Sequence, residues 1–118
     1  MLLTDRVVAT DPQRPVPMTF RISTTPDGAV LLAIEGALDS TTSRDLSEQL
    51  EALVKRRLPR VEVDLSRLHT IDSAGVGTLV SLYKSVRAQG GTFTITGLKD
   101  QPLAIIRLLK LDRVLTGG

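Results

Sequence analysis

The chain has 118 residues, 42% of them hydrophobic and 24% charged, which is long enough for one hydrophobic core and too short for two. It has no cysteine and a single histidine, His69, which excludes disulfides, thiolate nucleophiles and the usual Cys- or His-based metal sites. The net charge is only +2, and the aromatic residues are one Tyr and two Phe, too few for a base-stacking platform. We expect a single soluble domain with no metal, no cofactor and no direct contact with nucleic acid.

Neither a membrane helix nor a secretory signal is predicted. The longest uncharged apolar stretch, residues 29–34, is far shorter than the ~20 residues that a membrane helix needs. The amino-terminal segment carries Asp5, Arg6 and Asp11 and lacks a continuous apolar centre. We expect a cytoplasmic protein without membrane contact.

An amino-terminal arm is predicted over residues 1–17. Pro12, Pro15 and Pro17 fall in this segment, and its lack of hydrophobic periodicity is typical of a flexible or loosely docked arm. The domain is therefore expected to span residues 18–118.

A β-hairpin and a helix are predicted next. Residues 20–22 alternate apolar and polar side chains, residues 25–28 read Thr-Pro-Asp-Gly, and residues 30–34 are apolar, the pattern of two strands joined by a turn. Farther on, leucines recur at helical spacing until Pro59. The candidate capping residues of this helix are Ser40, Thr41 and Thr42.

The rest of the chain alternates strands and helices. The predicted elements are strands at 61–65 and 92–96 and helices at 76–86 and 102–111. Gly90-Gly91 closes the second helix, and Asp100 caps the third. Because a helix separates successive strands, these strands must run parallel. The predicted fold is α/β: a mixed sheet of four to five strands with helices mainly on one face.

The candidate site lies beyond the carboxyl ends of two parallel strands, where binding groups collect in open sheets. Leu38-Asp39-Ser40 follows one strand, and residues 71–77, Ile-Asp-Ser-Ala-Gly-Val-Gly, lead into the second helix. Since one crossover separates the two strands, Asp39 and Ser73 are expected at the same edge of the domain.

On local chemistry these residues are typical of helix caps and turns, because Ser and Asp accept backbone N–H groups there. A phosphate-binding loop is not favoured, since no Gly-Lys-Ser/Thr follows the glycines. Nucleophilic catalysis by Ser73 would need a base oriented by a third group, and His69 has no evident partner, so we interpret it as a loop residue. Asp39 and Asp72 could form an acid–base pair or bind Mg²⁺, but two isolated aspartates do not make an active site. No enzymatic activity is predicted.

A family resemblance adds to this interpretation. Residues 35–39 read Glu-Gly-Ala-Leu-Asp, residues 61–79 contain Asp-Leu-Ser followed by Asp-Ser-Ala-Gly-Val-Gly, and residues 90–91 are Gly-Gly. Together they resemble the STAS domain of bacterial anti-sigma-factor antagonists, over about three quarters of the chain. The resemblance implies a regulatory protein that binds an anti-sigma factor with serine kinase activity and so frees a sigma factor. It also implies inactivation by phosphorylation of a serine, reversed by a PP2C-type phosphatase.

Carried over by position, Ser73 is the phosphoacceptor that the resemblance implies. Ala74 stands where family members often have a second hydroxyl residue, which excludes modification there. The implied partner-binding residues are Asp39, Ser40, Asp72, Ser73, Ala74, Gly75 and Val76. The alternative is an accessory STAS subunit of a phospholipid-transport ABC complex, in which the serine is not modified.

Overall fold

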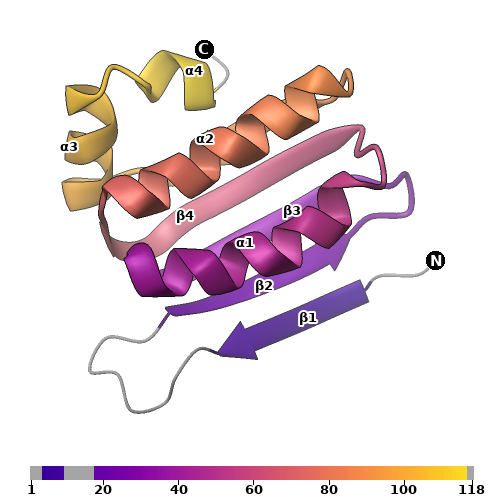
Figure 1. Ribbon diagram of the computed structural model, residues 1–118, viewed down its shortest axis with the longest axis horizontal. Coiled ribbons are helices and arrows are strands. Elements are labelled where there is room, and N and C mark those ends of the chain that lie inside the picture. Colours follow the sequence, from indigo (N-terminus) through magenta and orange to yellow (C-terminus); the bar gives the residue numbers. More distant parts are fainter. Residues whose placement is uncertain (1–3, 10–17, 117–118) are drawn as a thin grey trace.

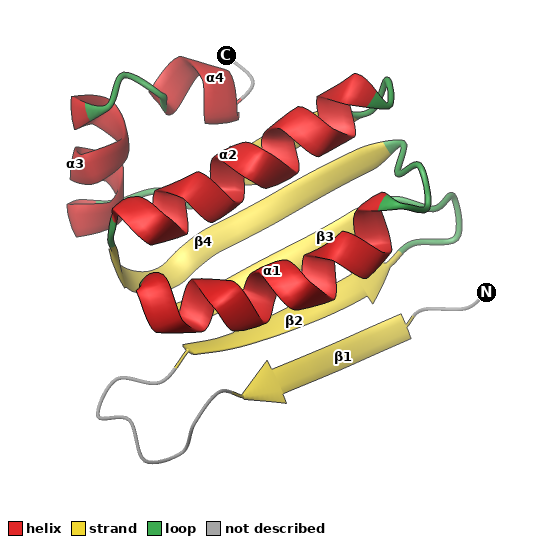
Figure 2. Ribbon diagram, viewed as in Figure 1, coloured by secondary structure: helices red, strands yellow, loops and turns green. Residues whose placement is uncertain are grey.

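A five-stranded mixed sheet and helices build the part of the chain that the computed structural model describes, residues 4–9 and 18–116 (Figures 1 and 2). The elements in chain order are β1 (Thr4–Ala9), β2 (Met18–Thr24), β3 (Val30–Leu38), α1 (Ser40–Val54), β4 (Arg60–Ile71), α2 (Ser73–Ala88), β5 (Thr92–Thr96), α3 (Asp100–Leu108) and α4 (Asp112–Thr116). The strand order is β1-β2-β3-β4-β5, antiparallel from β1 to β3 and parallel from β3 to β5. The predicted α/β fold with a mixed sheet is confirmed.

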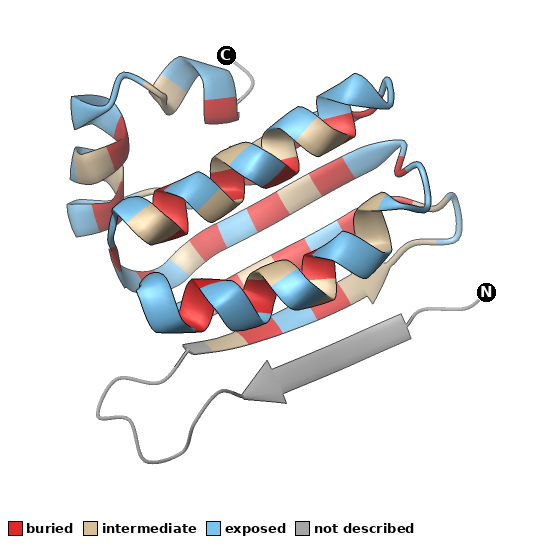
Figure 3. Ribbon diagram, in the orientation of Figure 1, coloured by how far each residue is buried: buried red, intermediate tan, exposed pale blue. Residues whose placement is uncertain are grey.

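The core lies between the sheet and the helices α1 and α2, which cover the same sheet face (Figures 1 and 3). Strand register aligns buried side chains in a row across this face: Ile22, Leu32, Val63 and Ile95. The helices add Leu46, Leu50, Leu79 and Val86, all buried. Burying a side chain of this size stabilises the fold by roughly 1.5–3 kcal/mol. The intervening strand residues, which point the other way, include the exposed Arg21, Glu35, Asp64 and Thr96.

The hairpin turn forms as its sequence predicts. The Gly28 N–H donates to the Thr25 carbonyl at 3.0 Å, and Gly28 adopts a φ of 92°, where glycine carries no Cβ penalty. The Thr25 hydroxyl donates to the Asp27 carboxylate and so holds the pKa of Asp27 below its usual value.

Within the segment predicted as a flexible or loosely docked arm, residues 1–17, Thr4–Ala9 forms the strand β1. This strand pairs antiparallel with β2 and places Val7 opposite Arg21. Its two consecutive valines favour extended backbone, and the free edge of β2 offers N–H and C=O groups to pair with. The three prolines come after the strand, in residues 10–17, which lie outside the described part of the chain.

The strand predicted at 61–65 is also longer than expected, because β4 continues to Ile71. It pairs with β3 as far as the Leu38–Ile71 pair, with register shifts between Ala33 and Glu35 and between Gly36 and Ala37. These shifts interrupt the alternation of buried and exposed residues along β4. A pattern of alternating apolar residues therefore predicts only the first half of the strand. His69, interpreted as a loop residue, is therefore an exposed strand residue.

Two helices end earlier than predicted. The first stops at Val54 instead of running to Pro59, and Arg57 takes a φ of 53°. The third stops at Leu108, Lys110 takes a φ of 59°, and a separate helix, α4, follows. A left-handed residue cannot continue a right-handed helix, so each of these positions turns the chain. The cap position of α3 is Lys99, not Asp100, and it makes no side-chain capping bond.

Candidate functional site

The edge of the sheet where β3 and β4 end brings the amino termini of α1 and α2 together. Leu38 and Ile71 are the last residues of the two strands and are paired in the ladder. The Asp72 N–H also donates to the Leu38 carbonyl at 3.1 Å. Asp39 and Asp72, the next residues along each strand, are the N-caps of the two helices. The prediction that Asp39 and Ser73 share one edge is confirmed.

Asp39 caps α1 through a reciprocal capping box. Its carboxylate accepts the backbone N–H groups of Thr41 and Thr42, both at 3.0 Å, and its own N–H donates to Thr42 Oγ1 at 2.8 Å. The Thr42 hydroxyl is fully buried and donates to the Ala37 carbonyl at 2.9 Å. The expected cap at Ser40, Thr41 or Thr42 is therefore wrong by one position or more, because Asp39 is the residue with extended backbone before the first helical turn.

Thr42→Val is expected to lower the free energy of unfolding by about 2 kcal/mol. The substitution keeps the shape of the side chain but leaves the Asp39 N–H and the Ala37 carbonyl without their partner, and an unpaired buried polar group costs roughly 1–3 kcal/mol. Urea unfolding followed by circular dichroism measures the change. Thr41→Val, at an exposed neighbour, is the matched control and should stay within about 0.5 kcal/mol of wild type. Equal stability of the two variants would contradict the role of Thr42.

Asp72 caps α2, and this leaves Ser73 uncommitted. The Asp72 carboxylate accepts the Gly75 N–H at 3.0 Å, so the interpretation of Asp72 as a capping residue is confirmed and that of Ser73 as the cap is wrong. Ser73 is the first residue of α2 and is exposed. Within the described ranges its hydroxyl makes no hydrogen bond. An accessible hydroxyl therefore stands at the surface at a helix amino terminus.

Gly75 and Val76 lie beneath this surface. A Cβ at Gly75 would stand 2.5 Å from the Leu38 carbonyl oxygen and 2.7 Å from Ile71 Cγ1, so the missing side chain lets α2 approach the ends of β3 and β4. Val76 is 4% exposed and belongs to the core. The predicted partner-binding residues thus separate into two layers. Those at least partly accessible at the edge are Asp39, Ser40, Asp72, Ser73 and Ala74.

The electrostatics of this edge combine two carboxylates with the positive end of a helix. Asp39 and Asp72 are the acidic residues that cap α1 and α2. Asp72 accepts the Gly75 N–H at its carboxylate and the Val76 N–H at its carbonyl, and Ser73 lies in the first turn of α2, where the helix dipole favours negative charge. The two ion pairs with both side chains described, Arg60–Glu62 at 3.9 Å and Arg67–Glu35 at 4.0 Å, belong to the strands.

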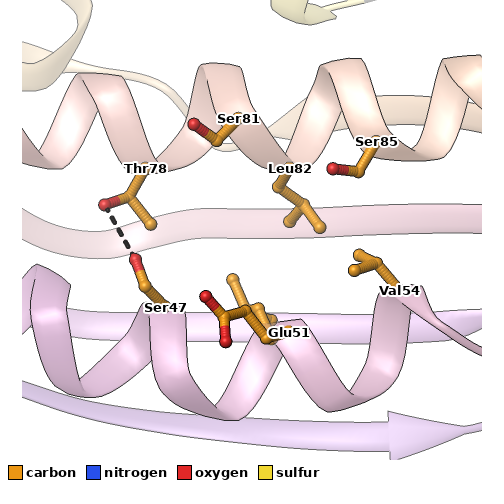
Figure 4. Close-up of a pocket in the computed structure, with 8 residues that line it drawn as sticks. Ser47, Glu51, Val54, Thr78, Ser81, Leu82 and Ser85 are labelled. Atoms are coloured by element: carbon orange, nitrogen blue, oxygen red, sulfur yellow. Dashed lines mark hydrogen bonds between the residues drawn. The ribbon is translucent and has the colours of Figure 1, made fainter.

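A groove of about 260 Å³ runs between α1 and α2 (Figure 4). Its lining residues are Ser47, Leu50, Glu51, Val54, Thr78, Ser81, Leu82 and Ser85. The hydroxyls of Ser47 and Thr78 meet across it at 3.4 Å. The wall of the groove therefore consists of hydroxyl groups, apolar side chains and one carboxylate, that of Glu51.

Among the described residues, no group of three or more His, Cys, Asp or Glu side chains could hold a metal ion, and no described helix is long and apolar enough to cross a membrane.

One residue at the site was missed by the sequence reasoning. Gln101, near the start of α3, accepts the Ile71 N–H at Oε1 and donates from Nε2 to the Ile71 carbonyl, both at 2.9 Å. Ile71 immediately precedes the Asp72 cap. Thirty positions separate the two residues in sequence, so no local pattern could have linked them.

A comparison with known protein families identifies the family to which this chain belongs. A family model described as "Mlab, STAS domain" matches residues 23–116. The chain belongs to the STAS domain family. This STAS domain is 32% identical over 73 residues to BtrV of Bordetella bronchiseptica, provisionally named an anti-sigma factor antagonist; the match covers 62% of this chain and 63% of BtrV, less than two thirds of that relative.

A second relative is named as a phospholipid-transport protein rather than as an anti-sigma factor antagonist. Solved structures of other proteins share the fold of this chain. The intermembrane phospholipid transport system binding protein MlaB of Escherichia coli is 31% identical over 80 residues, 68% of this chain and 79% of MlaB. The anti-sigma factor antagonist SpoIIAA in its unphosphorylated form superposes with a TM-score of 0.72 at 16% identity, covering 79% of this chain and 82% of SpoIIAA. SpoIIAA in the phosphorylated form gives 0.66 at 15% identity, covering 82% and 87%. At these identities the likeness to SpoIIAA concerns the fold alone.

Proposed function

We propose that this STAS domain is an anti-sigma factor antagonist controlled by phosphorylation of Ser73. In the unmodified form it binds an anti-sigma factor with serine kinase activity and so releases a sigma factor; the kinase then phosphorylates Ser73, and a PP2C-type phosphatase restores it. The observation that carries this proposal is the exposed, uncommitted Ser73 hydroxyl at the edge where Asp39 and Asp72 cap the two helices. Among the relatives, BtrV and SpoIIAA carry antagonist names, and SpoIIAA has been solved with and without phosphate.

The domain itself should tolerate the phosphate. A phosphoserine adds about −1.5 to −2 charge at pH 7. At Ser73, the first residue of α2, that charge meets the positive end of the helix dipole, which stabilises it by roughly 0.3–1 kcal/mol. The fold is therefore not the part that changes.

The docked interface should not tolerate it. A partner that covers this edge removes water from the phosphate and holds it beside the carboxylates of Asp39 and Asp72. An unpaired charge that loses its water costs several kcal/mol, and each ~1.4 kcal/mol is a factor of ten in affinity. The loss in the interface exceeds the gain at the helix terminus, so phosphorylation acts as a release switch.

Phosphorylation of one serine is the test. The protein is incubated with ATP and a purified candidate anti-sigma kinase, and mass spectrometry is expected to find a single added phosphate on Ser73. Ser73→Ala should accept none. Ser40, the exposed first residue of α1, is the matched position, and Ser40→Ala should be phosphorylated like wild type. Phosphate on Ser40, or on no residue with the cognate kinase, would overturn the proposal.

A second candidate function follows from the other relative. The matching family model is described as "Mlab", and MlaB itself is 31% identical. In this alternative the same edge contacts the ATPase of a phospholipid-transport ABC complex, and Ser73 is not modified. Titration against a purified transporter ATPase subunit and a purified anti-sigma factor separates the two: submicromolar binding to the ATPase alone, with no phosphate transfer, would favour the MlaB-like function.

A further inference from the structure

The last residue of β4 is paired on one side by a side chain instead of a strand. β5 ends at Thr96, opposite Asp64, whereas β4 continues to Ile71. The Asp72 N–H points to β3, so the N–H and carbonyl of Ile71 face the other way, toward the side that β5 has already left. Gln101 satisfies both groups at 2.9 Å.

The chemistry of Gln101 suits this place. A primary amide carries one acceptor and two donors in a single plane, so its Oε1 and Nε2 reproduce the acceptor and donor that a neighbouring strand would present. The chain takes an unusual path to deliver it: Lys99 is extended, and Asp100 adopts a φ of 54°. The buried Pro102 and Ile106 then anchor α3 on the rest of the domain. Figure 1 shows α3 beside the amino-terminal end of α2.

We propose that Gln101 is a positioning residue for Ser73. By holding Ile71 it fixes the direction in which the chain enters the Asp72 cap, whose backbone is extended with φ −110° and ψ −174°. The cap in turn sets the first turn of α2 and the orientation of the Ser73 hydroxyl. We call the two hydrogen bonds between Gln101 and Ile71 the clamp. Without the clamp, the end of β4 frays on one side and Ser73 samples orientations from which it does not react.

The catalytic consequence rests on the proposed function. In the kinase reaction the Ser73 oxygen forms a bond to the γ-phosphorus of ATP, the bond from that phosphorus to the bridging oxygen of ADP breaks, and the hydroxyl proton passes to a base of the kinase. The reaction requires an aligned oxygen. Loss of the clamp should therefore slow the chemical step more than it weakens docking, because the clamp orients the start of α2, whereas the accessible Asp39 and Ser40 belong to the start of α1.

Gln101→Met tests the proposal, because it keeps the length of the side chain and removes both hydrogen bonds. Gln89→Met is the matched control: Gln89 also donates from Nε2 to a backbone carbonyl, that of Val54 at 2.5 Å, but it lies beyond the far end of α2. Amide hydrogen exchange at Ile71 and at Gly75, whose N–H reports the Asp72 cap, is expected to accelerate about tenfold or more in Gln101→Met only. With the kinase, kcat should fall about tenfold and KM should change less than twofold.

The possible outcomes separate the positioning role of Gln101 from the proposed phosphorylation of Ser73. Unchanged exchange at Gly75 in Gln101→Met overturns the positioning role, whatever the kinase does. Faster exchange with wild-type kcat overturns it as well, since the clamp would then be only structural. If wild type accepts no phosphate, the proposed function fails, and faster exchange at both amides in Gln101→Met but not in Gln89→Met still supports the clamp.

Discussion

Ser73→Asp is expected to weaken binding of the cognate anti-sigma factor by about 100-fold, which corresponds to ~2.7 kcal/mol. The aspartate places one negative charge in the docked edge beside Asp39 and Asp72, where removal of water leaves it unpaired. The free energy of unfolding should stay within about 0.5 kcal/mol of wild type, because an acidic residue in the first turn of α2 agrees with the helix dipole. Isothermal titration calorimetry measures the affinity, and urea unfolding measures the stability.

Ser73→Asn is the control for this prediction. It has nearly the same size and shape as the aspartate variant and carries no charge, so its loss of affinity should be much smaller. If Ser73→Asp binds as tightly as wild type while remaining folded, the charge-driven release switch is wrong. If Ser73→Asn weakens binding as strongly as Ser73→Asp, the effect is steric rather than electrostatic.

Gly75→Ala is expected to have the largest effect on stability, a loss of about 3 kcal/mol. The new Cβ would stand 2.5 Å from the Leu38 carbonyl oxygen, a backbone atom in the ladder that cannot move away freely. Overpacking of this kind costs typically 1–3 kcal/mol, occasionally more. α2 would have to shift from the ends of β3 and β4, and the Asp72 N–H to Leu38 bond would lengthen with it.

Gly77→Ala, two residues farther along α2, is the matched comparison and should act in the opposite direction. Nothing lies within 4 Å of a Cβ at Gly77, and replacing glycine by alanine inside a helix stabilises it by roughly 0.5–1 kcal/mol. Urea midpoints of the two variants should therefore move to opposite sides of wild type. A stable Gly75→Ala protein would show that α2 does not need its close approach to the strands.

The predictions from sequence were correct where residues within a short stretch of the chain determine the local structure. The hairpin turn at 25–28 needs only a proline, an aspartate and a glycine in order, and the helices α1 and α2 follow from leucine and valine spacing. Two successive strands joined by a helix must run parallel, so the meeting of Asp39 and Ser73 at one edge also followed. The STAS resemblance over the Asp72-Ser73 motif is likewise a local feature, and the family match confirms it.

The predictions failed where the deciding partner lies far along the chain. The strand β1 forms because the distant edge of β2 is open, and β4 reaches Ile71 because β3 continues beside it with shifted register. Asp39 and Asp72 are caps, as their residue type suggested, but the hydroxyls beside them, which were also expected to cap, do not serve as N-caps, because the extended backbone of each strand end continues through the aspartate.

By itself, the order of residues determined an α/β domain of the STAS family and the serine at its exposed edge, since periodicity, turn residues and motif are properties of neighbours in the chain. Only the tertiary structure decided that the Ser73 hydroxyl is free of capping, that Gly75 admits no side chain, and that Gln101 completes β4. The last two depend on contacts between residues that are distant in sequence, Gly75 with Leu38 and Gln101 with Ile71, and the distances across such contacts are set when the whole sheet and its helices pack together.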